Sequence, residues 1–262
     1  MSYKATYRTR TYKLRKGGTA RTSPVPSMRY EAIFREQGAR LVCGVDEVGV
    51  GAWAGPVVVG AVILPPGRRI YKVRDSKLLD GPRRRWLSER VKEQALSWAI
   101  GVCWPAEIDA LGLSEAIRRA ATDAIGGLLV QPDAVLLDGQ WNFLKRPGGD
   151  HAGQLPGFGE PELPDSFGGP VKTVVRGDCE SVSIACASVV AKVFRDDLMA
   201  ELASIFGGYR FELNKGYPSP VHKWGLAAYG PSPIHRRLFF PVRRLVDEGV
   251  PGRLLPAASR PA

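Results

Sequence analysis

Two adjacent acids, Asp46 and Glu47, lie in the middle of an apolar, glycine-rich stretch that reads VCGVDEVGVGAWAGPVVVGAVIL from residue 42 to residue 64. Burying a charged carboxylate is costly unless something positive compensates it. The 20 residues from Val48 to Gly67 carry no charge, but their five glycines and three prolines are unsuited to a membrane-spanning helix. The stretch therefore predicts buried strands rather than a membrane segment, with two acids that need a cation nearby.

Apolar periodicity along the rest of the chain predicts an α/β fold. Two β-branched runs joined by a short glycine-rich link should form neighbouring antiparallel strands. Three strands in sequence, followed by helices that alternate with two more strands, favour a five-stranded mixed sheet flanked by helices. The predicted strands are 41–45, 56–64, 97–104, 134–137 and 171–175, and the predicted helices are 27–38, 82–96, two within 105–129 broken near Gly112, and one that Asp178 caps and that ends near Phe206.

Composition divides the chain into three parts. Residues 1–26 are a basic tail, residues 27–206 are the main domain with a Gly/Pro-rich loop at 147–170, and residues 207–262 form a small helical C-terminal lobe and tail. The four cysteines show no C-x-x-C spacing, which predicts reduced core thiols in a cytoplasmic protein. No feature indicates an oligomer, and we expect a monomer.

The charge balance points to a polyanionic partner. The net charge is +11 and the pI is near 9.7, which favours nucleic acid. The tail alone holds seven basic residues and no acid. Such a segment is either an arm that follows phosphates or a solvated tail, and the sequence leaves both open.

An acid also ends a second predicted strand, at Asp138, and two more acids, Asp196 and Asp197, lie on the long helix after the last strand. If the first and fourth strands are neighbours, Asp46 and Asp138 project from adjacent positions, and one helical acid completes a carboxylate cluster. Like charges raise carboxyl pKa values unless cations neutralise them, and oxygen ligands suit Mg²⁺ or Mn²⁺. In a basic protein this arrangement predicts two-metal hydrolysis of a phosphodiester.

Each acid also has a simpler interpretation. Consecutive strand residues point to opposite faces, so Asp46 and Glu47 can face one ion only if the glycine-rich turn from Gly49 ends or twists the strand. An Asp-Gly pair at 138–139 is typical of a turn, and Asp196 follows Lys192 by four residues, the spacing of a surface ion pair.

A series of motifs in order resembles bacterial ribonuclease HII from about Leu41 to Phe240. They are GVDEVGVGAWAGPVVVGAVIL, DSKLL, PAEIDALGLSEAIRRA followed by PDAVLLDG, RGDCESVSIACASVVAKVFRD, NKGYPSPVH and GPSPIHRRLFF. The resemblance implies a ribonuclease H-like fold. It also implies a divalent-metal endonuclease that cuts the RNA strand of RNA/DNA hybrids, and single ribonucleotides embedded in duplex DNA, leaving 3′-hydroxyl and 5′-phosphate ends.

The resemblance also implies roles for individual residues. The metal-binding, catalytic acids would be Asp46, Glu47, Asp138 and Asp196. Asp196 is preferred to Asp197 because the family's helical acid follows an arginine, as Asp196 follows Arg195. Tyr217 would contact the ribonucleotide sugar, and the glycine loop, with Gly49 and Gly51, would let backbone amides approach the 2′-hydroxyl. Phosphate contacts that carry no sequence information would come from Lys77, Lys192, His222 and Arg236.

The sequence departs from the family pattern in three places. Val50 stands where the loop usually has Arg or Lys, which removes a phosphate contact; the loop at 147–170 is longer than usual; and the basic tail is extra. Two alternatives stay open: a nucleic-acid-binding protein of the same fold with weakened catalysis, and a transposase- or resolvase-like DNA nuclease. The latter explains neither the Gly-Tyr-Pro segment nor the glycine loop. A sliding clamp is a candidate partner.

Overall fold

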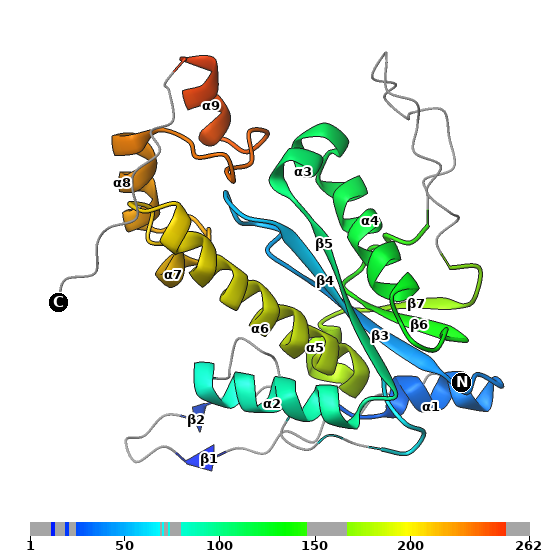
Figure 1. Cartoon of the computed structure of the whole chain (residues 1–262). Coiled ribbons are helices and arrows are strands. Elements are labelled where there is room, and N and C mark those ends of the chain that lie inside the picture. The colour runs from blue at the N-terminus through cyan, green and yellow to red at the C-terminus, as the bar shows by residue number, and fades with distance from the viewer. Residues whose placement is uncertain are drawn as a thin grey trace.

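A computed structural model describes residues 25–68, 70, 73, 80–145 and 167–249, together with the backbone of 12–13 and 19–20. At its centre is a five-stranded mixed sheet with the strand order β5-β4-β3-β6-β7 (Figure 1). Neighbouring strands are antiparallel from β5 to β3, and β6 runs parallel to both β3 and β7. The strands are β3 (Val42–Val48), β4 (Val57–Ile63), β5 (Ser97–Cys103), β6 (Ala134–Asp138) and β7 (Val171–Val174).

The sheet confirms the expected pairings. β3 and β4 are antiparallel neighbours joined by the glycine-rich link, and β3 lies beside β6, so the first and fourth predicted strands are adjacent. In the basic tail, β1 (Tyr12–Lys13) and β2 (Thr19–Ala20) pair with each other.

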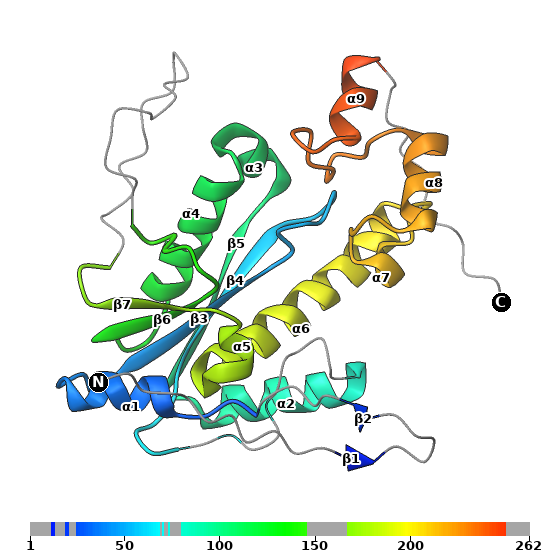
Figure 2. The same cartoon turned by 180° about the vertical axis from the view of Figure 1, so that it is seen from behind.

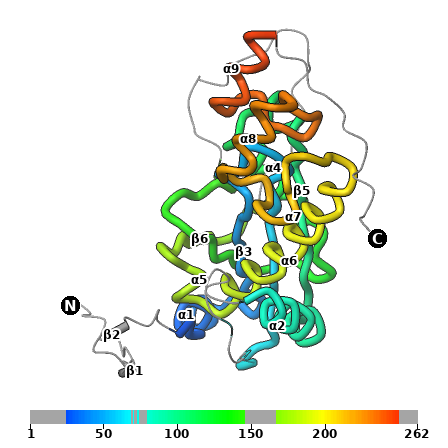
Figure 3. Tube along the Cα trace, turned by 90° about the vertical axis from the view of Figure 1, so that its left-hand side faces the viewer, coloured from blue at the N-terminus to red at the C-terminus, as the bar shows by residue number. Residues whose placement is uncertain are grey.

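Helices cover both faces of the sheet (Figures 1 and 2). α4 packs on one face against β4 and β5, while α6 packs on the other face against β3 and β4, with α2 beside it. α7, α8 and α9 gather at the C-terminal end of α6, and Figure 3 shows α8 and α9 at one end of the molecule with α1 and α2 at the other. The helices are α1 (Arg29–Glu36), α2 (Gly81–Gln94), α3 (Pro105–Leu111), α4 (Leu113–Gly126), α5 (Gly177–Glu180), α6 (Val182–Ile205), α7 (Phe211–Asn214), α8 (Pro220–Tyr229) and α9 (Val242–Asp247).

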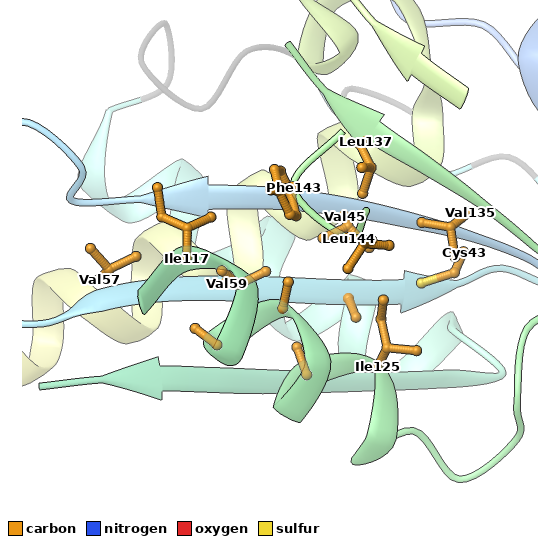
Figure 4. Close-up of a cluster of buried hydrophobic side chains, with 14 of the residues drawn as sticks. Cys43, Val45, Val57, Val59, Ile117, Ile125, Val135, Leu137, Phe143 and Leu144 are labelled. Carbon is orange, nitrogen blue, oxygen red and sulfur yellow. The ribbon is translucent and has the colours of Figure 1, made fainter. Parts of the chain in front are cut away.

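The largest apolar cluster lies between the sheet and α4. Alternate residues of β3 and β4 point into it and meet Ile117 and Ile125 of α4 (Figure 4). Each fully buried aliphatic side chain of this kind contributes about 1.5–3 kcal/mol to stability. The break between α3 and α4 falls at Gly112, where the backbone has a φ of +79°, as the sequence predicts.

On the other face, α6 approaches the sheet more closely than side chains would allow. A Cβ on Gly44 would lie 2.1 Å from the Ser183 carbonyl carbon, and a Cβ on Gly60 would lie 2.6 Å from the Ala187 oxygen. Gly60 is the partner of Asp46 in the β3–β4 register. The two glycines therefore bring the backbone of α6 directly against the strand that carries the acids.

The expectation that Asp178 caps the long helix is wrong. α6 begins at Val182, and its N-cap is Ser181, whose hydroxyl accepts from the Ile184 amide at 3.3 Å. Glu31 of α1 caps a second amide at this helix end, because its carboxylate accepts from the Ser183 amide at 2.9 Å. Asp178 lies one short helix earlier, in α5.

Three predictions concern residues outside the described ranges: Lys77, residues 147–166 of the long loop, and most of the basic tail. All four cysteines are buried and free, as expected for core thiols. Across the described part of the chain, no helix has the length and apolar character needed to cross a membrane.

Candidate active site

Asp46 and Asp138 are brought to one face of the sheet. Asp46 lies on β3 and Asp138 is the last residue of β6; the register pairs Val45 with Leu137, so the two acids are level with each other. Asp46 is 5% exposed and takes a hydrogen bond from the Ser188 side chain on α6. Asp138 Oδ1 accepts from the Gly177 amide at 2.6 Å. Both carboxylates are thus oriented by groups from the α5–α6 side.

A third acid, Asp178, lies close enough for its charge to act on Asp46. Burial raises the pKa of Asp46 well above its ordinary range, and the charges of Asp138, Glu47 and Asp178 raise it further. Asp178 is buried in α5, directly after the Gly177 amide that holds Asp138. The sequence contains a signal for it, because Asp178 follows a predicted strand after a short turn, as an acid follows the strands at Asp46 and Asp138.

Glu47 is the next residue of β3 after Asp46. β3 continues through both acids to Val48, and regular strand alternation would turn their side chains to different faces. A shared metal ion therefore requires the chain at the end of β3 to turn the Glu47 carboxylate toward Asp46. The Glu47 amide donates to Asp46 Oδ1 at 2.8 Å, and the Glu47 charge raises the Asp46 pKa.

Asp196 is held elsewhere. It pairs with Lys192, one helical turn before it, and with Arg84 of α2 at 3.3 Å, and it is 16% exposed. Its charge is not among those that raise the pKa of Asp46. The ion-pair interpretation of the Lys192–Asp196 spacing is therefore confirmed, and the structure does not bring Asp196 together with the other acids.

Divalent-ion binding can be judged from the donors present. Among the described residues, no group of three or more His, Cys, Asp or Glu side chains is arranged to hold a metal ion. The acids near Asp46 nevertheless form an all-oxygen donor set with mutual repulsion, and a hard divalent cation would relieve that repulsion. The donor chemistry fits Mg²⁺ or Mn²⁺, and binding would have to draw the carboxylates together.

The glycine loop after β3 is held by a buried arginine of α6. Arg195 is 0% exposed and donates to the carbonyl oxygens of Pro56 at 2.9 Å, Lys215 at 2.9 Å and Ala54 at 3.2 Å. Gly49 has a φ of +93°, and a Cβ there would lie 2.2 Å from Arg195 Nε. Only glycine fits at this position, because both the backbone conformation and the arginine exclude a side chain.

A second buried arginine sets the direction of the loop amides. Arg236 donates to the Gly55 carbonyl and to the Val50 carbonyl, both at 2.9 Å. The Val50–Gly51 peptide is trans, so its N–H points away from Arg236 when its carbonyl points toward it. Gly51 is exposed, and a Cβ there would meet nothing within 4 Å. The loop therefore presents the Gly51 amide outward.

Tyr217 lies beside this loop. Gly216, its predecessor, accepts through its carbonyl from the Trp53 amide at 2.8 Å and from the Ala54 amide at 3.3 Å. The half-buried Tyr217 ring has the Arg195 guanidinium 5.4 Å from its centroid and the Lys192 ammonium at 6.0 Å. An aromatic face with the Lys192 ammonium near it, beside an outward amide, suits a sugar-phosphate backbone.

Comparison with known proteins decides the family. The family model of ribonuclease HII matches residues 43–242. This chain belongs to the ribonuclease HII family. It is 45% identical over 199 residues to ribonuclease HII of Streptomyces avermitilis, covering 76% of each chain, and 44% identical over 212 residues to a ribonuclease HII of Thermus thermophilus, covering 81% of this chain and 92% of that one. As a member of the family, it is a metal-dependent endoribonuclease that acts on RNA/DNA hybrids.

Solved structures share the ribonuclease H-like fold. The crystal structure of ribonuclease H2 from Pyrococcus horikoshii OT3 matches with a TM-score of 0.62 at 23% identity, over 79% of this chain and 98% of that one. The crystal structure of Bst-RNase HIII in complex with Mn²⁺ matches with a TM-score of 0.56 at 16% identity, over 89% of this chain and 78% of that one. Identities this low carry the fold and nothing finer.

Two of the expected phosphate contacts need correction. His222 and Arg236 are each 0% exposed, so neither side chain can reach a phosphate. Arg236 supports the glycine loop, and His222 Nδ1 lies 2.9 Å from the Tyr217 carbonyl oxygen. Both residues are covered by chain segments that are distant in sequence, although polar residues of this kind usually lie at the surface. They therefore support the loop and Tyr217 from inside the protein.

Burial also predicts a pH dependence of stability. It lowers the pKa of His222 and lowers that of His235 from 6.5 to about 3. At a pH below 6.5 and above the lowered pKa, each of these histidines binds a proton in the unfolded chain but not in the folded chain. The free energy of unfolding should therefore fall as the pH drops from 7 to 5, by at most about 1.4 kcal/mol per pH unit for each histidine.

Urea unfolding at several pH values measures this slope. His235→Gln removes one of the two groups and should flatten the slope relative to the unsubstituted protein, whatever the carboxylates contribute to both. Equal slopes for the two proteins would show that His235 is protonated in the fold.

Proposed function

We propose that Asp46, Glu47 and Asp138, with Asp178 as the fourth acid, hold the Mg²⁺ or Mn²⁺ used by this enzyme. Support comes from the single observation that Asp138, Glu47 and Asp178 all act on the buried Asp46 carboxyl. Bound divalent ions activate the attacking water and stabilise the leaving oxygen in phosphodiester hydrolysis. The protein orients two of the acids in advance, through Ser188 on Asp46 and the Gly177 amide on Asp138.

Recognition of the ribonucleotide would fall to the loop and Tyr217. An outward Gly51 amide can donate to a 2′-hydroxyl, the group that distinguishes RNA from DNA. Tyr217 would pack on the sugar, and Lys192, paired with Asp196, would face the phosphate. These contacts involve one ribonucleotide and its neighbours, so the proposal includes cutting at single ribonucleotides embedded in duplex DNA, with 3′-hydroxyl and 5′-phosphate ends.

A sliding clamp is a further candidate partner. The structure of the PCNA:RNase HII complex from Archaeoglobus fulgidus contains a chain of similar fold, with a TM-score of 0.56 at 21% identity. The complex belongs to that protein, and clamp binding by this chain rests on the analogy of fold.

Cleavage of three matched duplexes tests the proposal. One carries a long RNA/DNA hybrid, one carries a single ribonucleotide in DNA, and one is all DNA; each is incubated with Mg²⁺ or Mn²⁺ and with EDTA. We expect cleavage of the first two only, metal dependence in both, and loss of activity in Asp46→Asn. Equal cleavage of the all-DNA duplex would contradict recognition of the 2′-hydroxyl. Binding without cleavage would instead favour a non-catalytic protein of the same fold.

Arg236 holds the loop through the backbone carbonyl of Val50, which any residue at this position would supply. The departure at Val50 should therefore affect affinity for the substrate rather than the chemistry. Val50→Arg should restore a phosphate contact and lower the Michaelis constant several-fold. The slope of log Kd against log salt should steepen by about 0.9 for one added contact.

Val50→Ala is the matched control, because the Val50 side chain packs against the main apolar cluster and its loss alone can change stability. A salt slope in Val50→Arg equal to that in Val50→Ala would exclude a phosphate role for position 50.

A further inference from the structure

Two buried histidines lie behind Tyr217, and the proposed cleavage reaction uses neither of them. His222 belongs to α8 and is 0% exposed, and His235 follows that helix and is 1% exposed. Their Nε2 atoms lie 3.0 Å apart. Each ring also has a partner at Nδ1: His222 faces the Tyr217 carbonyl oxygen at 2.9 Å, and His235 faces the Ser232 amide at 2.9 Å.

These three contacts allow only one arrangement of protons on two neutral rings. The Ser232 amide can only donate, so His235 Nδ1 accepts and His235 carries its proton on Nε2. That proton points at His222 Nε2, which must accept. His222 therefore carries its proton on Nδ1 and donates it to the Tyr217 carbonyl, which can only accept. The contacts form a directed chain from Ser232 to Tyr217.

The surroundings favour neutral rings. Phe211 meets the His222 ring edge-on at 5.3 Å between centroids, Tyr209 meets His235 at 4.9 Å, and Trp53 lies 5.7 Å from His222. These aromatic rings cannot hydrate a charge. A second proton on His222 would set two donors against each other at the Nε2–Nε2 contact, and a second proton on His235 would set Nδ1 against the Ser232 amide. The chain of hydrogen bonds is therefore intact only when both rings are neutral.

The segment that contains His235 and Arg236 is joined to the glycine loop. Ala54 pairs with His235 in an isolated antiparallel bridge, and the Arg236 amide donates to the Trp53 carbonyl at 2.8 Å. The Trp53 amide in turn donates to the Gly216 carbonyl, beside Tyr217. The histidine chain thus ends on the backbone of the two segments assigned to ribonucleotide recognition.

We propose that His222 and His235 are positioning residues that fix Tyr217 relative to the glycine loop through a chain of hydrogen bonds with defined tautomers. The inference rests on the proposed contact between Tyr217 and the ribonucleotide. Its consequence is that discrimination between a ribonucleotide and a deoxyribonucleotide depends on protons held on side chains that touch no substrate atom. Neither histidine takes part in the hydrolysis itself.

Matched substitutions separate positioning from packing. His222→Asn keeps a donor near the Nδ1 position, whereas His222→Phe keeps an aromatic ring and loses the donor. Single-turnover cleavage of a duplex with one ribonucleotide should lose about tenfold in kcat/KM in His222→Phe, mostly through KM, and should be restored to within a few-fold in His222→Asn. Equal losses in the two variants would overturn the proposal.

Tyr217→Ala distinguishes failure of this inference from failure of the proposed function. If Tyr217→Ala cleaves the single-ribonucleotide duplex as well as the unsubstituted enzyme, Tyr217 does not contact the substrate and the proposed recognition fails. If Tyr217→Ala is impaired while His222→Phe is not, the recognition stands and the histidine chain is overturned.

The tautomers can be measured without any activity. Nitrogen-15 NMR of the histidine rings in the intact protein should show His222 protonated on Nδ1 and His235 protonated on Nε2 at neutral pH. The chain has only three histidines, so signals are assigned by substitution. The opposite tautomers, or a charged ring at pH 7, would overturn the proposal even if a substituted protein failed to fold.

Discussion

Asp178→Asn should reduce cleavage of an RNA/DNA hybrid by more than about a hundredfold, whereas Asp196→Asn should stay within about tenfold of the unsubstituted enzyme. Loss of an outer partner of a metal ligand already costs about 10–100-fold, so loss of a direct ligand should cost more. Asp178 acts on the buried Asp46 carboxyl, while Asp196 is neutralised by Lys192 and Arg84. Single-turnover rates at saturating Mn²⁺ measure both effects.

Asp197→Asn is the matched control, because Asp197 lies next to Asp196 on α6 and pairs with the exposed Arg85 of α2. It should leave the rate unchanged. If Asp196→Asn loses as much as Asp178→Asn while Asp197→Asn does not, the helical acid belongs to the metal site, and the carboxylates must rearrange from the positions they have in the structure.

Arg195→Met should lower the free energy of unfolding by about 3–5 kcal/mol. The fully buried guanidinium satisfies three carbonyl oxygens from the glycine loop and the segment before Tyr217, and methionine leaves all three without this donor. Urea unfolding without metal measures the loss. Cleavage should also fall in the folded variant, because both segments lose their common support.

Arg243→Met provides the comparison. Arg243 is 67% exposed and pairs only loosely with Asp247 at 3.7 Å, so its loss should change stability by less than about 0.5 kcal/mol. Arg195→Lys should fall between the two, since an ammonium cannot reach three carbonyls in a plane. An Arg195→Met protein as stable as Arg243→Met would show that other contacts hold the loop.

The strands were predictable because their signals are contiguous. The apolar run on either side of Gly49–Gly55 specifies two antiparallel strands, and the acids at Asp46 and Asp138 indicate where strand ends meet. Asp178 was missed because an acid before a helix has a simpler use as a cap, and only the structure shows that Ser181 and Glu31 fill that role at the start of α6.

Burial of charged residues was the harder part. Arg195, His222 and Arg236 have the sequence surroundings of surface residues, and their burial arises where α6, the glycine loop and the segment around α8 meet. Each is covered by chain segments distant in sequence, so no local pattern reports it. Resemblance to a family indicated that these positions matter, but it could not say on which side of the surface they act.

The close approach of α6 to the sheet means that catalysis depends on the absence of side chains at two positions, Gly44 and Gly60. Ser188, which bonds Asp46, lies on the helix whose backbone rests against Gly44 and Gly60. Adding one carbon at either glycine would push the helix outward and carry the serine away from the carboxyl. Inactivating substitutions in this enzyme should therefore include the two glycines, which have no functional group and contribute only the space that lets the backbone of α6 approach the sheet.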